Sequence, residues 1–453
     1  MFQLDNLLFY IQILNQIPDD KIDIVVKQMI DTARRTKGSI VVLADLFKQL
    51  PRDQRARYFT PMAQYLGIQE KINILDDLEN TVLKTEFFDL VFLIPGTKIF
   101  LFDADRSNFD NSFSNVNYDG FQIYGLSDYT KTWVLDSSVS NLKDRALNVH
   151  KVVNLDLNVL QFFNKYSQGR LNQHKGSMEK LLSYFKNNNF EYNMSTAMME
   201  RSKKTFEIKD KTIWNEIINN YLKFIRSDST VQNYTIVNLS EEEKITASEM
   251  IDSIGNLSDK NLKHYDAIAC LVSKAFLIKM DNTIKHKLDM LLEYSLDVLN
   301  VYLENEIILL DAYFKQDASV SRTFKKIEGI SKDTKNKILN TIWDIFHVRL
   351  MEAQMYSENK KEDIFLHYFS SHDKAFEELL LYNPLKMFVI HDGKQYAIRE
   401  RGIVSICDNN NLLNKISSEA KKRSSNANNV DFKTELTNLF SEITKLQDKQ
   451  FNK

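Results

Sequence analysis

The spacing of apolar residues divides the chain into helical and strand-like stretches. In SIVVLADLFKQL (39–50) apolar side chains recur every three or four positions, and similar stretches up to about residue 80 predict amphipathic helices. From about residue 86 the apolar runs become short and continuous, which is typical of strands. The predicted strands are FFDLVFLI (87–94), joined by a Pro-Gly turn to TKIFLFD (97–103) as a β-hairpin, then FQIYGL (121–126) and KTWVLD (131–136).

Beyond about residue 150, strand-like and helical stretches alternate. We expect strands at KVVNLDL (151–157), EDIFLHYFS (362–370) and LKMFVI (385–390), and a last hairpin from QYAIRE (395–400) and GIVSI (402–406). Helical spacing fills most of the chain between the first two of these strands, and residues 241–320 have a helical pattern throughout. Alternating strands and helices are typical of an α/β protein with a parallel sheet.

The C-terminal stretch has a different pattern. Residues 417–429 are polar and predict a flexible linker. In the tail that follows, apolar residues from Phe432 to Leu446 fall on one helical face, so we expect a helix that docks on the body of the protein, on a partner or on a second copy. The predicted division is a helical N-terminal region at 1–80, a small strand-containing region at 81–148, an α/β domain at 149–410 with a helical insertion at about 206–330, and the linker with its C-terminal helix at 411–453.

Composition narrows the possible functions. The 453 residues include 59 Lys and Arg against 61 Asp and Glu, so any contact with nucleic acid must come from a local basic patch. The sequence has no GxGxxG and no GxxxxGK[ST] motif, which argues against Rossmann and P-loop phosphate sites. Its 2 cysteines form neither a disulfide framework nor a zinc motif, and no apolar run reaches the roughly 18 residues of a membrane span. We therefore expect a cytoplasmic protein that does not cross a membrane.

Two aspartates lie at or just after the ends of predicted strands. Asp156 interrupts the apolar run VVNLDLNVLQFF (152–163), and Asp373 follows the strand at 362–370 in FSSHDKAF. An unpaired buried charge is costly, so Asp156 either caps the following helix or belongs to a site. In open α/β sheets, ligands bind beyond the carboxyl ends of the strands, which is where we expect both aspartates.

Four acidic motifs, in their order along the chain, resemble those of the PIN-domain nucleases. They are LDLN with Asp156 and Asn158, AMMER with Glu200, DIFHVRLMEA with Asp344, and SHDKAF with Ser371 and Asp373. The resemblance covers roughly residues 150–205 and 330–392, under half of the chain, and implies a PIN-like α/β core. The 144-residue spacing from Glu200 to Asp344 is longer than in a compact PIN domain and indicates an insertion. The insertion contains a rival third acid, Asp266 in HYDAIACLVSKAF, but we prefer Asp344 because the fourth motif follows it directly.

The resemblance implies a site for Mg²⁺ or Mn²⁺. As catalytic residues and metal ligands it implies Asp156, Glu200, Asp344 and Asp373, with Asn158 and Ser371 supporting the carboxylates through hydrogen bonds. Hard divalent ions prefer carboxylate oxygens, and a pair of them can activate water and stabilise the anion that develops during phosphodiester hydrolysis. The candidate contacts to a nucleic-acid backbone are Arg201, Lys203 and Lys204.

We therefore expect a metal-dependent endonuclease that acts on RNA in preference to DNA, in a bacterial toxin or phage-defence role. Two alternatives stay open. One is a non-catalytic interaction protein whose helices bind a partner and whose nuclease-like core is degenerate. The other is a nucleotidyltransferase centred on Asp103 and Asp105, which follow a predicted strand in KIFLFDADRSN. The nuclease hypothesis requires Asp156, Glu200, Asp373 and either Asp344 or Asp266 to meet in one pocket.

Overall fold

The computed structural model describes the chain from residue 13 to residue 451, with gaps at 15, 36–42, 44–45, 48–49, 51, 79–83, 86, 89–95, 103, 105–106, 110–114, 138–147, 206–217, 223–224, 226–239, 360–362, 420–422 and 424–428. At 52–53, 201–205, 243–244 and 246–262 it describes the backbone alone. The helices are α2 (Asp19–Arg35), α4 (Arg52–Tyr65), α5 (Ile68–Asp77), α7 (Leu157–Ser167), α8 (Lys175–Asn187), α9 (Ser195–Thr205), α11 (Glu241–Met280), α12 (Lys287–Glu293), α13 (Glu304–Lys315), α14 (Ser321–Lys325), α15 (Thr334–Glu358), α16 (Ala375–Tyr382), α17 (Asn410–Ser418) and α19 (Phe432–Phe451).

The first sheet, sheet A, is antiparallel and has the strand order β4-β1-β8-β9. Its strands are β1 (Lys98–Leu101), β4 (Trp133–Asp136), β8 (Leu385–His391) and β9 (Lys394–Arg399). Because β1 pairs with β4 on one side and β8 on the other, the expected hairpin of 87–94 with 97–103 is wrong, and residues 87 and 88 are helical. The physical reason is burial: all four residues of β1 are buried, which an isolated two-stranded hairpin does not achieve.

The second sheet, sheet B, is mixed and has the strand order β2-β3-β7-β5-β6. Its strands are β2 (Val116–Tyr118), β3 (Phe121–Gly125), β5 (Val149–Leu155), β6 (Glu191–Asn193) and β7 (Ile364–Ser371). The β5 strand is parallel to both β6 and β7, and its last residue, Leu155, lies opposite Ser370. The residues that follow β5 and β7 therefore meet at the same edge of the sheet.

The end of sheet A corrects another prediction. The strand at 395–400 turns back onto the strand at 385–390 through Asp392 and Gly393, whose φ angles of 46° and 67° form a tight hairpin turn. Residues 403–405 form a short 3₁₀ helix, so the hairpin expected from QYAIRE and GIVSI is wrong. The predicted strands at 121–126, 131–136, 151–157, 362–370 and 385–390 are confirmed within a residue or two at their ends, while the helical stretch 241–320 is broken between α11, α12 and α13.

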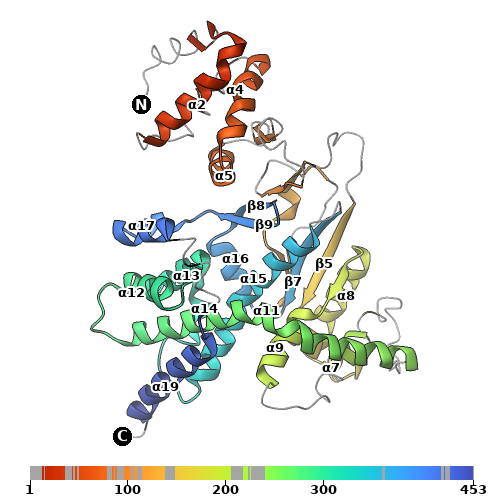
Figure 1. Ribbon diagram of the computed structural model, residues 1–453. Helices are drawn as coiled ribbons and strands as arrows, with labels where there is room; N and C mark the ends of the chain where they lie inside the picture. Colours follow the sequence, from red (N-terminus) through yellow and green to blue (C-terminus); the bar gives the residue numbers. More distant parts are fainter. Residues whose placement is uncertain are drawn as a thin grey trace.

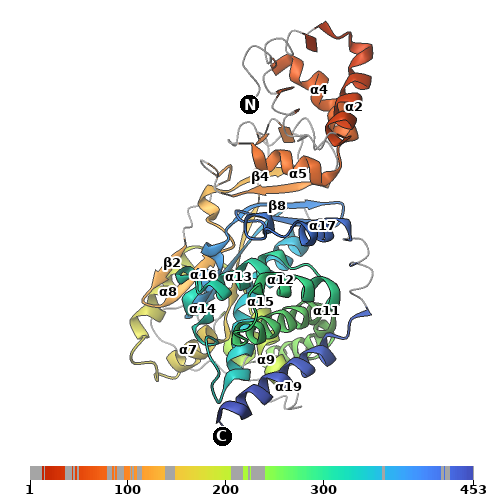
Figure 2. The ribbon, with the colours of Figure 1, turned by 90° about the vertical axis from the view of Figure 1, so that its left-hand side faces the viewer.

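Apolar side chains cover both faces of sheet A. On one face, Ile99, Leu135 and Val389 belong to a hydrophobic cluster that also contains buried residues of helices α2, α4 and α5. On the other face, Phe100 and Phe388 belong to a larger core that includes sheet B and the later helices. Figures 1 and 2 show the N-terminal helices at one end of the molecule and α19 at the other, with the sheets between them.

The C-terminal helix α19 docks on the body of the protein. Phe432, Leu439 and Ile443 are buried, and the helix packs along α11 and α15. The Nε2 amide of Gln447, near its end, donates to the carbonyl oxygen of Ser331 at 2.8 Å. The apolar face predicted from the sequence is thus covered within the chain itself.

The chain is a mixed α/β protein, mostly helical, with two sheets, one of which contains parallel strands. Strands from residues 81–148 enter both sheets, β1 and β4 in sheet A and β2 and β3 in sheet B, while the division into four regions stays a prediction. None of the helices in the described part of the chain has the length and apolar character that a membrane span requires.

Candidate metal centre

Asp156 lies at the junction of β5 and α7. Its backbone N–H donates to the carbonyl oxygen of Ser370 at 3.0 Å, which extends the parallel pairing by one residue. Its carboxylate is buried and accepts a hydrogen bond of 2.5 Å from the Ser371 hydroxyl to Oδ2. The charge that interrupts the apolar run is therefore held at the carboxyl edge of sheet B.

Ser371 and Asn158 link the ends of the two strands. The Nδ2 amide of Asn158 donates to Ser371 Oγ at 3.3 Å, and its Oδ1 accepts from the backbone N–H of His372 at 3.1 Å. Ser371 supports a carboxylate directly, as the resemblance implied, whereas these two hydrogen bonds of Asn158 go to Ser371 and to the backbone. Together they fix the position of Asp156 relative to the chain that leads to Asp373.

Asp373 lies in the turn between β7 and α16. Its backbone N–H donates to Ser371 Oγ at 3.0 Å, and its Oδ1 accepts from the backbone N–H of Ala375, at the start of α16, at 2.9 Å. Its Oδ2 points to Lys326, 3.4 Å from the ammonium nitrogen. Asp373 therefore supports the first turn of α16 with one oxygen and faces a charged group with the other.

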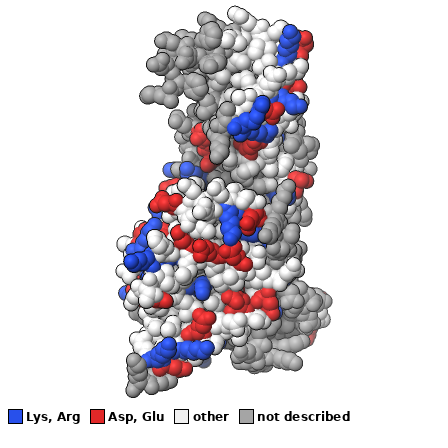
Figure 3. Space-filling view, turned by 60° about the vertical axis from the view of Figure 1, so that its left-hand side comes forward, with Lys and Arg blue, Asp and Glu red and all other residues white. Residues whose placement is uncertain are grey.

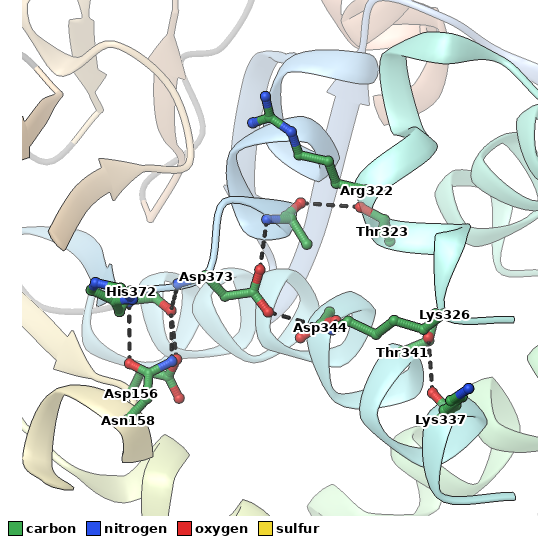
Figure 4. A network of polar contacts seen from close by, with 12 residues as sticks. Asp156, Asn158, Arg322, Thr323, Lys326, Lys337, Thr341, Asp344, His372 and Asp373 are labelled. Atoms are coloured by element: carbon green, nitrogen blue, oxygen red, sulfur yellow. Dashed lines mark hydrogen bonds and ion pairs between the residues drawn. The ribbon is translucent and has the colours of Figure 1, made fainter. Parts of the chain in front are cut away.

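Asp344 reaches the same region from α15. Its Oδ2 lies 3.0 Å from Lys326 Nζ, and its side chain is 18% exposed. Figure 4 shows Asp373 between the group formed by Asp156 and Asn158 and the pair formed by Asp344 and Lys326. The ammonium of Lys326 bridges Asp344 and Asp373, the acids of the third and fourth motifs.

These side chains line one pocket of about 280 Å³. Its lining residues are Asp156, Leu157, Asn158, Gln161, Glu200, Lys326, Asn340, Trp343, Asp344, His347 and Asp373. All four predicted acids are among them, although Glu200 and Asp344 come from helices α9 and α15 rather than from strand ends. The rival acid Asp266 is buried on α11 and is not among these lining residues.

The acids of the pocket perturb one another electrostatically. Burial, followed by the charge of Glu200, raises the pKa of Asp156 to about 7, against the partial compensation from the Ser371 hydrogen bond. Burial also raises the pKa of Asp344 to about 7, even though the neighbouring Lys326 ammonium lowers it. For Lys326, burial lowers the pKa, but the charges of Asp344 and Asp373 outweigh burial and raise it above its ordinary value. A pocket of this kind favours a bound cation, because a cation stabilises the ionised carboxylates.

The predicted metal ions can be tested against these donors. Four carboxylates in one small pocket are the ligand type that Mg²⁺ and Mn²⁺ prefer, so the donor chemistry fits. The arrangement is incomplete in this conformation: over the part of the chain that the structure describes, no three Asp, Glu, His or Cys side chains are grouped so as to hold a metal ion. In this conformation two of the four acids, Asp344 and Asp373, pair with the Lys326 ammonium.

Sequence reasoning missed Lys326. It lies just after the short helix α14 in SRTFKKIEG, with no strand end, glycine turn or acid motif beside it that would single it out from the adjacent Lys325. Only the tertiary arrangement shows which of the two lysines enters the pocket.

Other candidates lie outside what the structure describes. Asp103 and Asp105 are among the undescribed residues, so the nucleotidyltransferase alternative gains no support there. For Arg201, Lys203 and Lys204 the structure gives the helical backbone of α9 alone, and their contact with nucleic acid stays a prediction.

Comparisons of this chain with protein-family models, with curated proteins and with solved structures find no match. The pocket itself is therefore the basis for assigning a function.

Proposed function

We propose that this protein is a divalent-metal-dependent nuclease whose metal ligands are Asp156, Asp344 and Asp373, with Glu200 as a direct or water-mediated ligand. One observation carries the proposal. Four acids that are far apart in the sequence, and that were selected by a resemblance to PIN-domain nucleases, line a single pocket. The pocket also lies where α/β sheets bind ligands, beyond the carboxyl ends of the parallel strands β5 and β7.

At such a site, some residues of the chain would hold the cation and others would orient the carboxylates. The Ser371 hydroxyl donates a hydrogen bond to one carboxylate oxygen of Asp156 and so orients that side chain. The backbone N–H of Ala375 does the same for Asp373. A bound Mg²⁺ or Mn²⁺ would supply an activated water and would stabilise the negative charge that develops on the phosphate. The carboxylates that would hold the cation are carried by strand ends and helices, so completing the site would call for movement of side chains rather than of these backbone elements.

The proposed substrate is RNA, with DNA as the second choice. The charge on the surface is mixed: on the face in Figure 3, the described Lys and Arg side chains lie in small groups among Asp and Glu. A nucleic acid would therefore be held through a few local contacts and through the metal ions, and weakly at high salt. We further propose a bacterial toxin or phage-defence role, because most of the chain lies outside the acid motifs and could restrain the activity until a trigger arrives.

The test is cleavage of end-labelled single-stranded RNA and DNA in Mn²⁺, Mg²⁺ or EDTA. Wild type should cleave at least one substrate with metal and none in EDTA. Asp156→Asn should reduce the rate roughly hundredfold or more, because it removes a ligand charge from the pocket. Asp392→Asn is the matched control, since Asp392 is exposed in the β8–β9 turn and its φ of 46° suits asparagine. Equal cleavage by wild type and Asp156→Asn would exclude the pocket as the source of the activity.

The role in defence has its own test. Cells that express the wild type should lose viability or resist infection under phage challenge or stress, and cells that express Asp156→Asn should not. If both proteins are equally harmless under these conditions, the role is wrong, whatever the result of the cleavage assay.

A non-catalytic interaction protein is the second candidate, and one observation favours it. The ion pairs of Lys326 with Asp344 and Asp373 supply a cation without any metal. On this hypothesis neither wild type nor Asp156→Asn binds Mn²⁺ or cleaves either nucleic acid. Binding of Mn²⁺ by wild type in the micromolar to millimolar range, lost in Asp156→Asn, would exclude it.

A further inference from the structure

Lys326 occupies a distinctive place in the pocket. It is the one lysine or arginine among the described residues that line the pocket, and four acidic residues line the same pocket. Its Nζ lies 3.0 Å from Asp344 Oδ2 and 3.4 Å from Asp373 Oδ2, so a single ammonium pairs with both acids (Figure 4). A bridging position between two carboxylates is also where a divalent ion would bind them together.

The backbone around Lys326 is firmly held. Thr323 donates its hydroxyl to the carbonyl oxygen of Ala375 at 3.1 Å, and the backbone N–H groups of Arg322 and Thr323 donate to Glu378 Oε2 on α16 at 2.9 and 3.2 Å. On the far side, the backbone carbonyl of Ile327 accepts from the Tyr313 hydroxyl at 2.6 Å. The backbone on both sides of Lys326 is therefore anchored, to α16 on one side and to Tyr313 on the other.

The Lys326 side chain has room to move. It is 33% exposed, while Phe324 and Ile327 on the same segment are buried. A lysine carries a compact charge on a flexible four-carbon stem, so its ammonium can swing out of the pocket without any change in the backbone. An arginine at this place would be a cation too, but a larger one with a planar fork.

Ammonium and metal cannot share this position. Mg²⁺ requires oxygen ligands at about 2.0–2.1 Å in a nearly octahedral shell, which leaves no space for an ammonium between the same two oxygens. We propose that Lys326 is a tethered cation that occupies the metal position between Asp344 and Asp373 in the metal-free protein, and that a divalent ion must displace it to bind. This inference rests on the proposed metal-dependent function and adds a regulatory property to that site: the protein's own side chain sets the metal concentration at which the site fills.

The test measures binding of Mn²⁺ alone, without substrate, by calorimetry or by the electron paramagnetic resonance signal of the free ion. Lys326→Met removes the charge and keeps a similar length, so the affinity for Mn²⁺ should rise roughly tenfold or more. Lys326→Arg keeps a competing cation and should bind Mn²⁺ no more tightly than wild type. Lys325→Met is the matched control on the same segment, because Lys325 is exposed and does not line the pocket, and it should match wild type.

The outcomes separate this inference from the proposed function. If wild type binds Mn²⁺ and Lys326→Met binds it equally or more weakly, the proposed displacement of Lys326 is wrong, while the proposed metal site is unaffected. If Lys326→Met and Lys325→Met tighten binding alike, the effect is one of overall charge, and the displacement is again wrong. If neither wild type nor any variant binds Mn²⁺, the metal site and the displacement both fail. Should Lys326→Met not fold, as judged by circular dichroism, Lys326→Gln replaces it with the same expectations.

Discussion

Replacing Asp156 by asparagine should make the metal-free protein more stable at alkaline pH. The carboxyl of Asp156 has a pKa of about 7 in the folded protein, raised first by burial and then by the charge of Glu200, against an ordinary value of 3.8. A tenfold change in an acid dissociation constant corresponds to about 1.4 kcal/mol, so holding Asp156 ionised above pH 7 opposes folding by about 4 kcal/mol at most. Asparagine is nearly isosteric, is never charged, and can still accept the Ser371 hydrogen bond.

The sign of the pH dependence follows from the raised pKa. Between about pH 4 and pH 7 the folded protein holds a proton at Asp156 that the unfolded chain has lost, so stability falls as pH rises through this window and then levels off. Asp344, whose pKa is also raised to about 7, adds to the same trend. In Asp156→Asn the contribution of residue 156 disappears, and the fall should be shallower.

The assay is urea unfolding in EDTA at pH 5 and pH 8, followed by tryptophan fluorescence, because Trp343 lines the pocket. Asp156→Asn should exceed wild type in free energy of unfolding at pH 8 by up to about 4 kcal/mol and by much less at pH 5. Asp392→Asn should follow wild type at both values. A variant that is less stable than wild type at pH 8 would refute the reasoning, since it would show that the carboxylate of Asp156 stabilises the fold.

Three further outcomes follow from the same structure. Ser371→Ala removes the hydrogen bond to the Asp156 carboxylate and should reduce stability by about 1.5–3 kcal/mol at pH 8 in EDTA, measured by urea unfolding; no change would mean that water replaces the hydroxyl. Adding Mn²⁺ should raise the thermal midpoint of wild type more at pH 8 than at pH 5, because the carboxylates must be ionised to bind it, and an equal shift at both values would contradict this. Leu439→Ala creates a cavity between α19 and the body and should lower the free energy of unfolding by about 2–5 kcal/mol, measured in urea. Phe451→Ala, at an exposed position of the same helix, should lower it little.

The strand-end acids could be predicted because their signal is local. Asp156 and Asp373 each follow a short apolar run, and parallel strands bring such positions to one edge whatever the rest of the fold does. Predicting that Glu200 and Asp344 lie in the same pocket requires more information, because their positions depend on how α9 and α15 pack over that edge of the sheet. The sequence supplied these two only through the resemblance to PIN-domain nucleases, which itself stays a prediction.

Non-local pairing accounts for one of the two strand predictions that were wrong. The turn at Pro95-Gly96 favours a local partner for the strand at 97–103, but β1 pairs with β8 from near the other end of the chain. The Asp392-Gly393 pair is a local turn signal between β8 and β9, whereas the apolar pattern at 402–406 predicts a strand where the structure has a short 3₁₀ helix. Lys326 had no local signal at all, because what distinguishes it from Lys325 is the direction of one side chain on a folded backbone.

The order in which the strands are synthesised determines when a nascent chain could become active inside the cell that makes it. The hydrogen bond between Asp156 and Ser371 joins residues 215 positions apart, and that between Thr97 and His391 joins residues 294 apart. A chain still on the ribosome lacks β7, Asp373 and β8 until these residues have been translated, so before then it can close neither sheet and cannot assemble the acids. Fragments left by interrupted translation upstream of β7 should therefore be inert as nucleases, and any activity would belong to chains that extend beyond β8.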